Sequence, residues 1–223
     1  IEKYVTDKRY FSLNNWIKHG SIFGFDFIFE DLPKTLLPFD FTTYYNYPGT
    51  LQVGTTDCRT GQDVWFGKEA IGKSFTPVRA SSSMPFLAPI VKFDRRELLD
   101  GALVSPIPYK KAQQEGYEKF IFVLTRNVGY HKKNHIPQIL LKTWYKDYPK
   151  LWEIMEQRPA LYNKQLEEAE RLEQEGKAVI IRPQIPLEID KLDIKPDKLM
   201  ALHDHGIGCG LAAYDRIMKL AEK

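Results

Sequence analysis

An aspartate followed by a glycine closes a short apolar segment, in the run Leu98-Leu99-Asp100-Gly101-Ala102. An acid directly after a strand lies at the strand's C-terminal end, where α/β folds build their active sites. The glycine lets the backbone turn sharply and lets another segment come close. A carboxylate in this position can serve as a general base. Because Asp-Gly is also a common turn signal, the dipeptide alone favours a structural role.

A carboxylate base needs a nucleophile, and the sequence contains no Gly-x-Ser-x-Gly elbow. Ser21 follows Gly20 but lacks the flanking pattern, and the serines at 81, 82 and 83 have no bracketing glycines. Close packing beside a site explains those three small residues as well as a nucleophile cluster does. We therefore assign no nucleophile within this chain.

Two histidines and a cysteine near the C-terminal end, His203, His205 and Cys209, form a second group of reactive side chains. Residues four apart share a helix face, so a metal site is conceivable there. Metal sites show denser ligand spacing, and we predict neither metal nor other cofactor. A Cys–His nucleophile pair is the alternative chemistry, while a structural cysteine is the commoner case. We expect the glycines at 206, 208 and 210 to interrupt this helix or to allow close helix packing.

Composition narrows the class of protein. The chain has 223 residues, 43% of them hydrophobic, and a net charge of +3 from 32 basic and 29 acidic residues. This is typical of a soluble globular protein and gives no reason to expect a nucleic-acid partner. No apolar run approaches the ~20 residues that span a bilayer. Two cysteines are too few for a disulfide framework, which favours a cytoplasmic setting.

A basic loop at residues 126–135 lies near aromatic side chains in the sequence. Its cationic and titratable residues are Arg126, His131, Lys132, Lys133 and His135, and the aromatics are Tyr130 and Trp144. Such a loop can contact anionic lipid headgroups. An exposed, solvated loop is the plainer interpretation.

The elements that must position Asp100 follow from hydrophobic patterning and turn signals. Residues 51–56 and 62–66 predict a hairpin around a turn at 58–61, and residues 76–81 a short helix. Residues 87–91 and 97–99 predict extended segments around a turn at 94–95. Residues 110–115 predict a helix that ends at Gly116. The uncharged run 120–125 predicts a strand buried on both faces, as in a parallel sheet.

Helices dominate the remainder of the chain. The pattern predicts helices over 137–148 and 159–176, a buried strand over 178–182, and a helix or helix pair over 196–223. The aromatic-rich first fifty residues predict short helices and packed turns, with Asp40 capping a helix that begins near Phe41. Helices interleaved with strands argue for a layered α/β fold.

The surroundings of Asp100 resemble the later half of the patatin-like phospholipase domain. The similarity lies in the stretch 80–86, Ala-Ser-Ser-Ser-Met-Pro-Phe, followed by Asp100-Gly101-Ala102 and then the strand at 120–125. It is closer still to bacterial patatin-like proteins with a C-terminal extension, through residues 20–27, 38–41, 54–58 and 124–126. That family uses a serine–aspartate dyad whose acid stands in an Asp-Gly-Gly or Asp-Gly-Ala motif, which Asp100 matches.

The resemblance implies a fold and an activity. Residues 1–126 would form a partial patatin-like three-layer α/β/α sandwich lacking its N-terminal elements, and residues 127–223 a mostly helical extension. The whole protein would hydrolyse a lipid or another acyl ester, with Asp100 as the base and Gly101 and Ala102 supporting it. The nucleophilic serine would lie upstream of Ile1, so we expect this chain alone to be inactive. The alternative is a non-catalytic lipid-surface or protein-interaction module in which Asp100 is only a turn residue.

Overall fold

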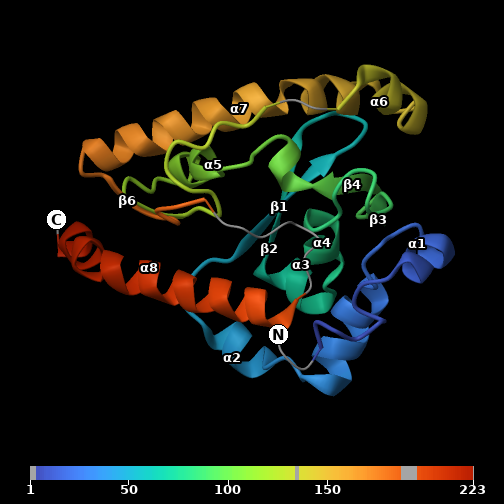
Figure 1. Ribbon diagram of the computed structural model, residues 1–223, viewed down its shortest axis with the longest axis horizontal. Coiled ribbons are helices and arrows are strands. Elements are labelled where there is room, and N and C mark those ends of the chain that lie inside the picture. Colours follow the sequence, from blue (N-terminus) through green and yellow to red (C-terminus); the bar gives the residue numbers. More distant parts are fainter. Residues whose placement is uncertain (1–3, 134–135, 187–194, 223) are drawn as a thin grey trace. The chain divides into compact units, whose positions relative to one another are not determined.

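The computed structural model describes residues 4–133, 136–186 and 195–222, which form a mixed α/β protein (Figure 1). The predicted α/β class is confirmed. The described residues fall into two compact units. The sheet unit contains residues 7–106 and 136–158, and the α8 unit contains residues 4–6, 107–133, 159–186 and 195–222. The domain boundary expected near residue 126 stays a prediction.

The sheet unit is built on four antiparallel strands. They are β1 (Gln52–Asp57), β2 (Asp63–Gly67), β3 (Val91–Phe93) and β4 (Arg96–Asp100), in the order β2-β1-β4-β3. The predicted β1–β2 hairpin is confirmed, and so is the turn at Asp94 and Arg95, where both residues are left-handed. Of the extended segment predicted over 87–91, only Val91 belongs to a strand, because Pro89 cannot donate to a ladder.

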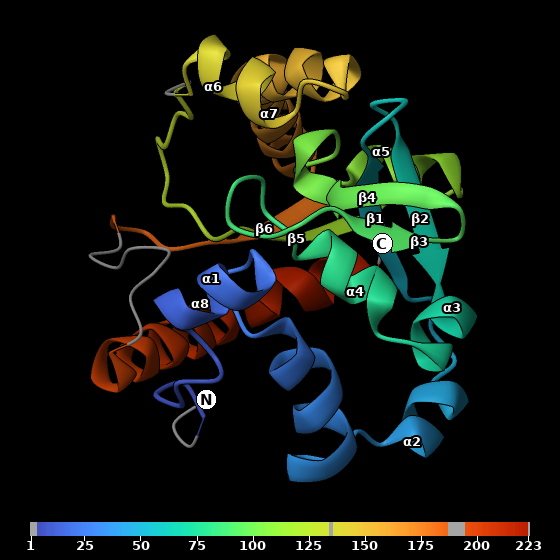
Figure 2. The same cartoon turned by 90° about the vertical axis from the view of Figure 1, so that its right-hand side faces the viewer.

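Helices cover both faces of this sheet (Figure 2). Successive strand residues point to opposite faces, so the neighbours Leu98 and Leu99 enter different cores. Leu98 packs with Ala80 of α4 (Thr76–Ser81), a helix that occupies the predicted residues. Leu99 packs with Leu141 of α6 (Gln138–Trp144) and Leu151 of α7 (Pro149–Gln174). The last two residues before Asp100 are therefore fully buried on either side of the sheet.

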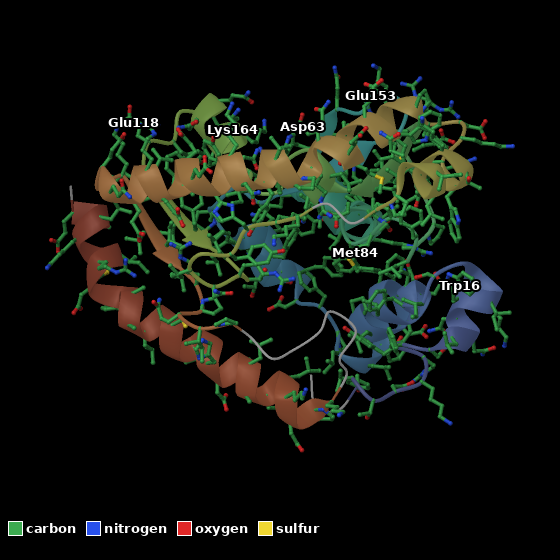
Figure 3. The ribbon with its side chains drawn as sticks, turned by 45° about the horizontal axis from the view of Figure 1, so that its top comes forward. Trp16, Asp63, Met84, Glu118, Glu153 and Lys164 are labelled. Atoms are coloured by element: carbon green, nitrogen blue, oxygen red, sulfur yellow. The ribbon has the colours of Figure 1, made fainter. Side chains whose placement is uncertain are left out.

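The aromatic-rich start of the sheet unit forms short helices, as predicted. These are α1 (Leu13–His19), the π-helix η1 (Phe27–Leu36) and α2 (Phe41–Asn46), with α3 (Lys68–Lys73) following the hairpin. Asp40 caps α2 by accepting the N–H of Thr43 at 2.9 Å, which confirms its predicted role. Trp16 lies exposed on α1 (Figure 3).

The α8 unit contains a parallel strand pair. β5 (Phe120–Val123) pairs with β6 (Ala178–Ile181), and α5 (Tyr109–Gln114) precedes β5 and ends before the left-handed Gly116. Side chains from α5 and α7 cover one face of the pair. α8 (Pro196–Glu222) covers the second face of β6 only. The prediction that residues 120–125 are buried on both faces is wrong, because Ile121 and Val123 are 51% and 72% exposed.

Two helices differ from their predicted bounds. α7 begins at Pro149 and runs through Pro159, where the sequence predicted its start. α8 continues through Gly206, Gly208 and Gly210, so the predicted interruption is wrong: glycine costs helix stability but keeps its backbone hydrogen bonds. A Cβ built on any of these three glycines meets no atom within 4 Å, so close packing within the described residues does not require them. Among the described helices, none is long and apolar enough to cross a membrane.

Candidate active site

Asp100 is the last residue of β4, where the sequence placed it, and its backbone is held from two directions. In the β1–β4 ladder it stands opposite Thr55, and its carbonyl accepts a hydrogen bond from the hydroxyl of Thr56 at 2.8 Å. Its N–H donates to the carbonyl of Ser83, just beyond α4, at 3.0 Å. The strand end therefore has little freedom to shift relative to β1 or α4.

The carboxylate of Asp100 caps the turn that follows. Oδ1 accepts the N–H of Ala102 at 2.8 Å and begins the short 3-10 helix η2 (Gly101–Leu103). The side chain is half-buried. This hydrogen bond fixes the orientation of the carboxylate, which a preorganised general base requires.

Gly101 is required by close approach of another strand, as the sequence predicted. A Cβ at this position would lie 2.3 Å from the carbonyl oxygen of Gly54 in β1 and 3.1 Å from the nitrogen of Thr55. Both neighbours are backbone atoms of a strand paired on both sides. Every residue other than glycine would therefore push the turn away from β1.

An arginine that sequence reasoning missed completes the turn. Nε of Arg158, in α7, donates to the carbonyl of Ala102 at 2.9 Å. The next residue, Leu103, is fully buried in the core with Leu99. Arg158 is 56 positions away in the sequence, and no local signal links it to the Asp-Gly motif.

Of the serines at 81–83, Ser83 contacts the site through its backbone carbonyl. The hydroxyl of Ser82 donates to the carbonyl of Val78, and that of Ser83 donates to the carbonyl of Arg79. Ser83 is fully buried. Its contribution to the site is the carbonyl that accepts the N–H of Asp100.

Of the three residues considered for a metal, the structure brings two together. Sγ of Cys209 lies 3.5 Å from Nε2 of His205, whereas Nδ1 of His203 lies 3.2 Å from the carboxylate of Asp204. Across the part of the chain that the structure describes, no group of three or more histidine, cysteine or acidic side chains is arranged to hold a metal ion.

The described part of the basic loop, residues 126–133, belongs to the α8 unit, and His135 lies outside the described residues. The guanidinium of Arg126 lies 5.0 Å from the ring centre of Tyr130, and the ammonium of Lys132 lies 5.2 Å from that of Tyr162. The backbone of Lys132 also exchanges two hydrogen bonds with the side chain of Asn163. These contacts engage part of the loop's charge within the protein.

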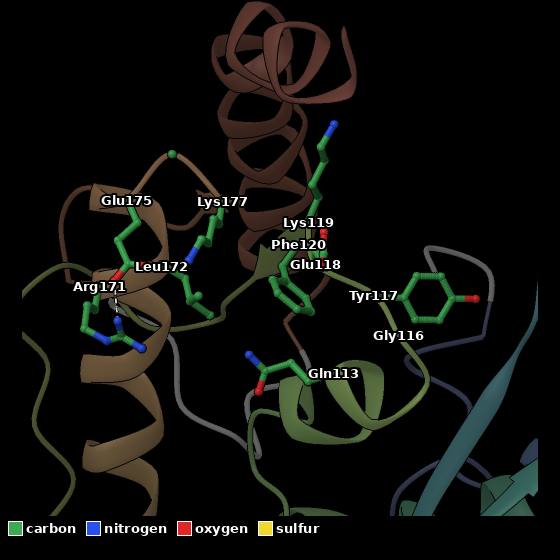
Figure 4. Close-up of a pocket in the computed structure, with 11 residues that line it drawn as sticks. Gln113, Gly116, Tyr117, Glu118, Lys119, Phe120, Arg171, Leu172, Glu175 and Lys177 are labelled. Carbon is green, nitrogen blue, oxygen red and sulfur yellow. Dashed lines mark hydrogen bonds and ion pairs between the residues drawn. The ribbon is translucent and has the colours of Figure 1, made fainter. Parts of the chain in front are cut away.

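A surface pocket of about 540 Å³ in the α8 unit lies between the end of α5 and the end of α7 (Figure 4). Its one arginine, Arg171, pairs with Glu168 and Glu175, and Lys177 also pairs with Glu175. These acidic neighbours, Glu168 above all, raise the pKa of the Arg171 guanidinium above its ordinary value. We assign no ligand to this pocket.

Comparison with known proteins gives a match to the C-terminal third of the chain. Residues 148–222 match a family model described as a domain of unknown function, DUF6363. No curated protein matches the chain. The matched residues include α7, β6 and α8, while Asp100 lies outside them.

Proposed function

We propose that this chain supplies the carboxylate base of a patatin-like serine acyl hydrolase acting on a lipid or a related acyl ester. The observation that carries the proposal is the Asp100-Gly101-Ala102 turn. Its backbone is hydrogen-bonded to Thr56 of β1, to Ser83 just beyond α4 and to Arg158 of α7. A turn needed only to reverse the chain does not require a residue at which any Cβ would lie 2.3 Å from the carbonyl oxygen of Gly54 in the neighbouring strand. The resemblance of this motif to the family's dyad aspartate supplies the identity of the reaction.

The proposed chemistry needs a serine on a segment outside this sequence. A serine hydroxyl is a weak nucleophile until a base removes its proton. The carboxylate of Asp100 would accept that proton directly as the oxygen attacks the ester carbonyl. Backbone N–H groups of a glycine-rich loop would stabilise the oxyanion, and water would release the acyl group with the same carboxylate as base. The residues of this chain bind no oxyanion in this scheme, so the chain alone would not turn over substrate.

The architecture of the sheet unit supports this assignment. Helices on both faces of the β1–β4 sheet are what a three-layer α/β/α sandwich contains, and Asp100 stands at a strand end between those layers. We further propose that the protein works in a reducing compartment such as the cytoplasm. Both of its cysteines are free, which suits such a compartment.

The test is ester hydrolysis by the whole protein, including the segment that carries the serine, and by its Asp100→Asn variant. The Asn side-chain carbonyl can still accept the N–H of Ala102, so the turn survives while the base is lost. We expect activity to fall by about 10²–10⁴-fold, the usual contribution of a general base. Asp94→Asn is the matched control, since Asp94 lies exposed in the β3–β4 turn of the same sheet. Full activity in a folded Asp100→Asn variant would make Asp100 a turn residue.

A second candidate function, attachment to an anionic lipid surface, is favoured by helix α6. Its outer side exposes Ile139, Leu140 and Trp144, with Ile139 at 74% and Trp144 at 55% exposure. Lys142 and Lys146 lie exposed beside them. Apolar side chains with a tryptophan and flanking lysines are the composition of helices that bind at a membrane interface.

Vesicle sedimentation tests this second candidate independently of catalysis. We expect the protein to bind phosphatidylcholine vesicles more strongly when they contain phosphatidylserine, and the double change Ile139→Ser and Trp144→Ser to remove that binding. Leu13→Ser on α1 is a control, because Leu13 is equally exposed on another helix of the sheet unit. Binding that ignores either the lipid charge or the α6 changes would exclude this function.

A further inference from the structure

A pocket of about 250 Å³ in the α8 unit brings together a cysteine, a histidine and two arginines. It lies between the end of β6 and the middle of α8, and its polar lining comes from Cys209, His205, Arg182, Arg216 and Gln184. Neither the dyad chemistry nor the lipid contact uses these residues.

Cys209 and His205 are one helical turn apart and face each other. Sγ lies 3.5 Å from Nε2, within the distance at which an imidazole can accept a thiol proton. Both side chains are partly exposed. Gly208 also lines the pocket and places no side chain beside the sulfur. A reagent can therefore approach the thiol from the pocket side.

Two arginines line the pocket, and each pairs with a glutamate that does not line it. Arg182 pairs with Glu170 at 2.6 Å, and Arg216 pairs with Glu173 at 2.9 Å. Arg216 also donates to the carbonyl of Ile180 at 3.3 Å. A guanidinium has five N–H donors, so each arginine retains capacity to bind a carboxylate after making these bonds. The pairing with glutamates fixes the position of each guanidinium.

The second cysteine of the chain is an internal control. Cys58 is fully buried in the core of the sheet unit. Burial, aided by the neighbouring Asp57 and Glu97 carboxylates, raises the pKa of its thiol to about 12. Such a cysteine is inert towards reagents in solution, because the thiolate is the nucleophile.

We propose that Cys209 is a nucleophilic thiol site that exchanges with small anionic disulfides, of which glutathione disulfide is the test compound. His205 Nε2 accepts the proton as Sγ attacks one sulfur of the disulfide. A new S–S bond forms to Cys209, the original S–S bond breaks, and the departing thiolate takes the proton from the imidazolium. Cys209 is thereby oxidised to a mixed disulfide and one equivalent of thiol is released. Arg182 and Arg216 bind the carboxylates of the incoming compound.

The site can be located by intact-protein mass spectrometry and peptide mapping after exposure to glutathione disulfide. We expect one added glutathione, on Cys209, which Cys209→Ser abolishes and Cys58→Ala leaves in place. Modification of both cysteines at equal rates in the folded protein would overturn the proposal.

Rates then separate a built site from an accidentally exposed thiol. His205→Gln should slow the reaction with every disulfide about tenfold or more, because the proton acceptor is lost. Arg216→Gln should slow the reaction of Cys209 with glutathione disulfide about tenfold, the usual effect of losing a hydrogen bond to a charged group. It should leave the rate of the reaction with neutral hydroxyethyl disulfide unchanged. Arg216→Lys should retain part of that preference, because it retains the charge. If all variants react like the parent with both disulfides, Cys209 is merely exposed and the proposal fails.

Discussion

Replacing Gly101 by alanine tests the packing on which the Asp100 turn depends. The added Cβ would lie 2.3 Å from the carbonyl oxygen of Gly54 and 2.6 Å from its carbon, whereas real Cβ atoms essentially never approach within 3.0 Å. Gly101 is not in the left-handed region, so alanine can adopt its backbone conformation. The effect of the substitution is therefore steric.

The loss of stability depends on whether β1 can shift to relieve the overlap with the added Cβ. The overlap of about 0.7 Å falls on β1, which is paired with β2 on one edge and β4 on the other. Overpacking a rigid site costs about 1–3 kcal/mol, while the less flexible unfolded chain of an alanine variant returns about 0.4–1 kcal/mol. We expect a net loss of about 1.3 kcal/mol, or a fall in Tm of roughly 5 °C at the ~4 °C per kcal/mol typical of a domain this size.

Tryptophan fluorescence during urea or thermal unfolding measures this loss where it occurs. All four tryptophans of the chain, at positions 16, 65, 144 and 152, lie in the sheet unit with Gly101. Gly72→Ala is the matched control. Its Cβ would lie 2.0 Å from the hydroxyl of Tyr45, the far end of an exposed side chain that can swing away. Since Gly72 lies inside α3, alanine should leave stability unchanged or raise it.

Two results would contradict a close contact between Gly101 and β1. If Gly101→Ala unfolds at the same midpoint as the parent, the turn does not press against β1. If Gly72→Ala loses as much stability as Gly101→Ala, the side chain of Tyr45 is as rigid as the backbone of Gly54. In either case β1 does not fix the position of Gly101, and Asp100 loses its structural support as a catalytic residue.

Three further predictions concern single interactions. Tyr145→Phe removes the 2.8 Å hydrogen bond from the left-handed Phe86 N–H to a buried hydroxyl, and should cost about 1–3 kcal/mol in urea unfolding followed by tryptophan fluorescence. Gly206→Ala should stabilise the α8 unit by about 0.5–1 kcal/mol in thermal unfolding followed by circular dichroism, because its Cβ meets nothing within 4 Å. Hydrogen bonds from Thr43 lower the pKa of the Asp40 carboxyl. The cap on α2 should therefore persist below the usual aspartate pKa and be lost only as pH falls through the lowered value. A carboxyl titration by NMR should show this shift of the Asp40 midpoint, and Thr43→Val should reduce the shift.

The sequence predicts the elements around Asp100 better than the contacts between them. The hairpin, the helix at residues 76–81 and the strand that ends at Asp100 each depend on local patterning and appear at the expected positions. The partners that hold the turn, Thr56, Ser83 and Arg158, depend on tertiary packing. A hydroxyl 44 residues away and a guanidinium 56 residues away leave no periodic signal near the motif.

Pro159 accounts for the wrong start predicted for α7. A proline in this position predicts the start of a helix. The helix begins ten residues earlier, because side chains on both sides of Pro159 are buried in a core. Leu151 and Met155 before it are buried in the core of the sheet unit, and Leu166 and Leu172 after it are buried in that of the α8 unit. A cost of about 3 kcal/mol for an interior proline is small beside that burial. The two compact units also divide at this residue, which no helical pattern could indicate.

The two proposed chemistries belong to different units, and this makes them separable. Asp100 and every partner found for its turn lie in the sheet unit, while Cys209, His205 and both arginines lie in the α8 unit. The DUF6363 match contains the thiol site and omits the carboxylate. It also contains Arg158, the residue of α7 that binds the turn's carbonyl. If the sheet unit is a hydrolase core and the α8 unit a redox-responsive extension, Arg158→Gln should impair ester hydrolysis without changing the reactivity of Cys209, and Cys209→Ser should do the reverse.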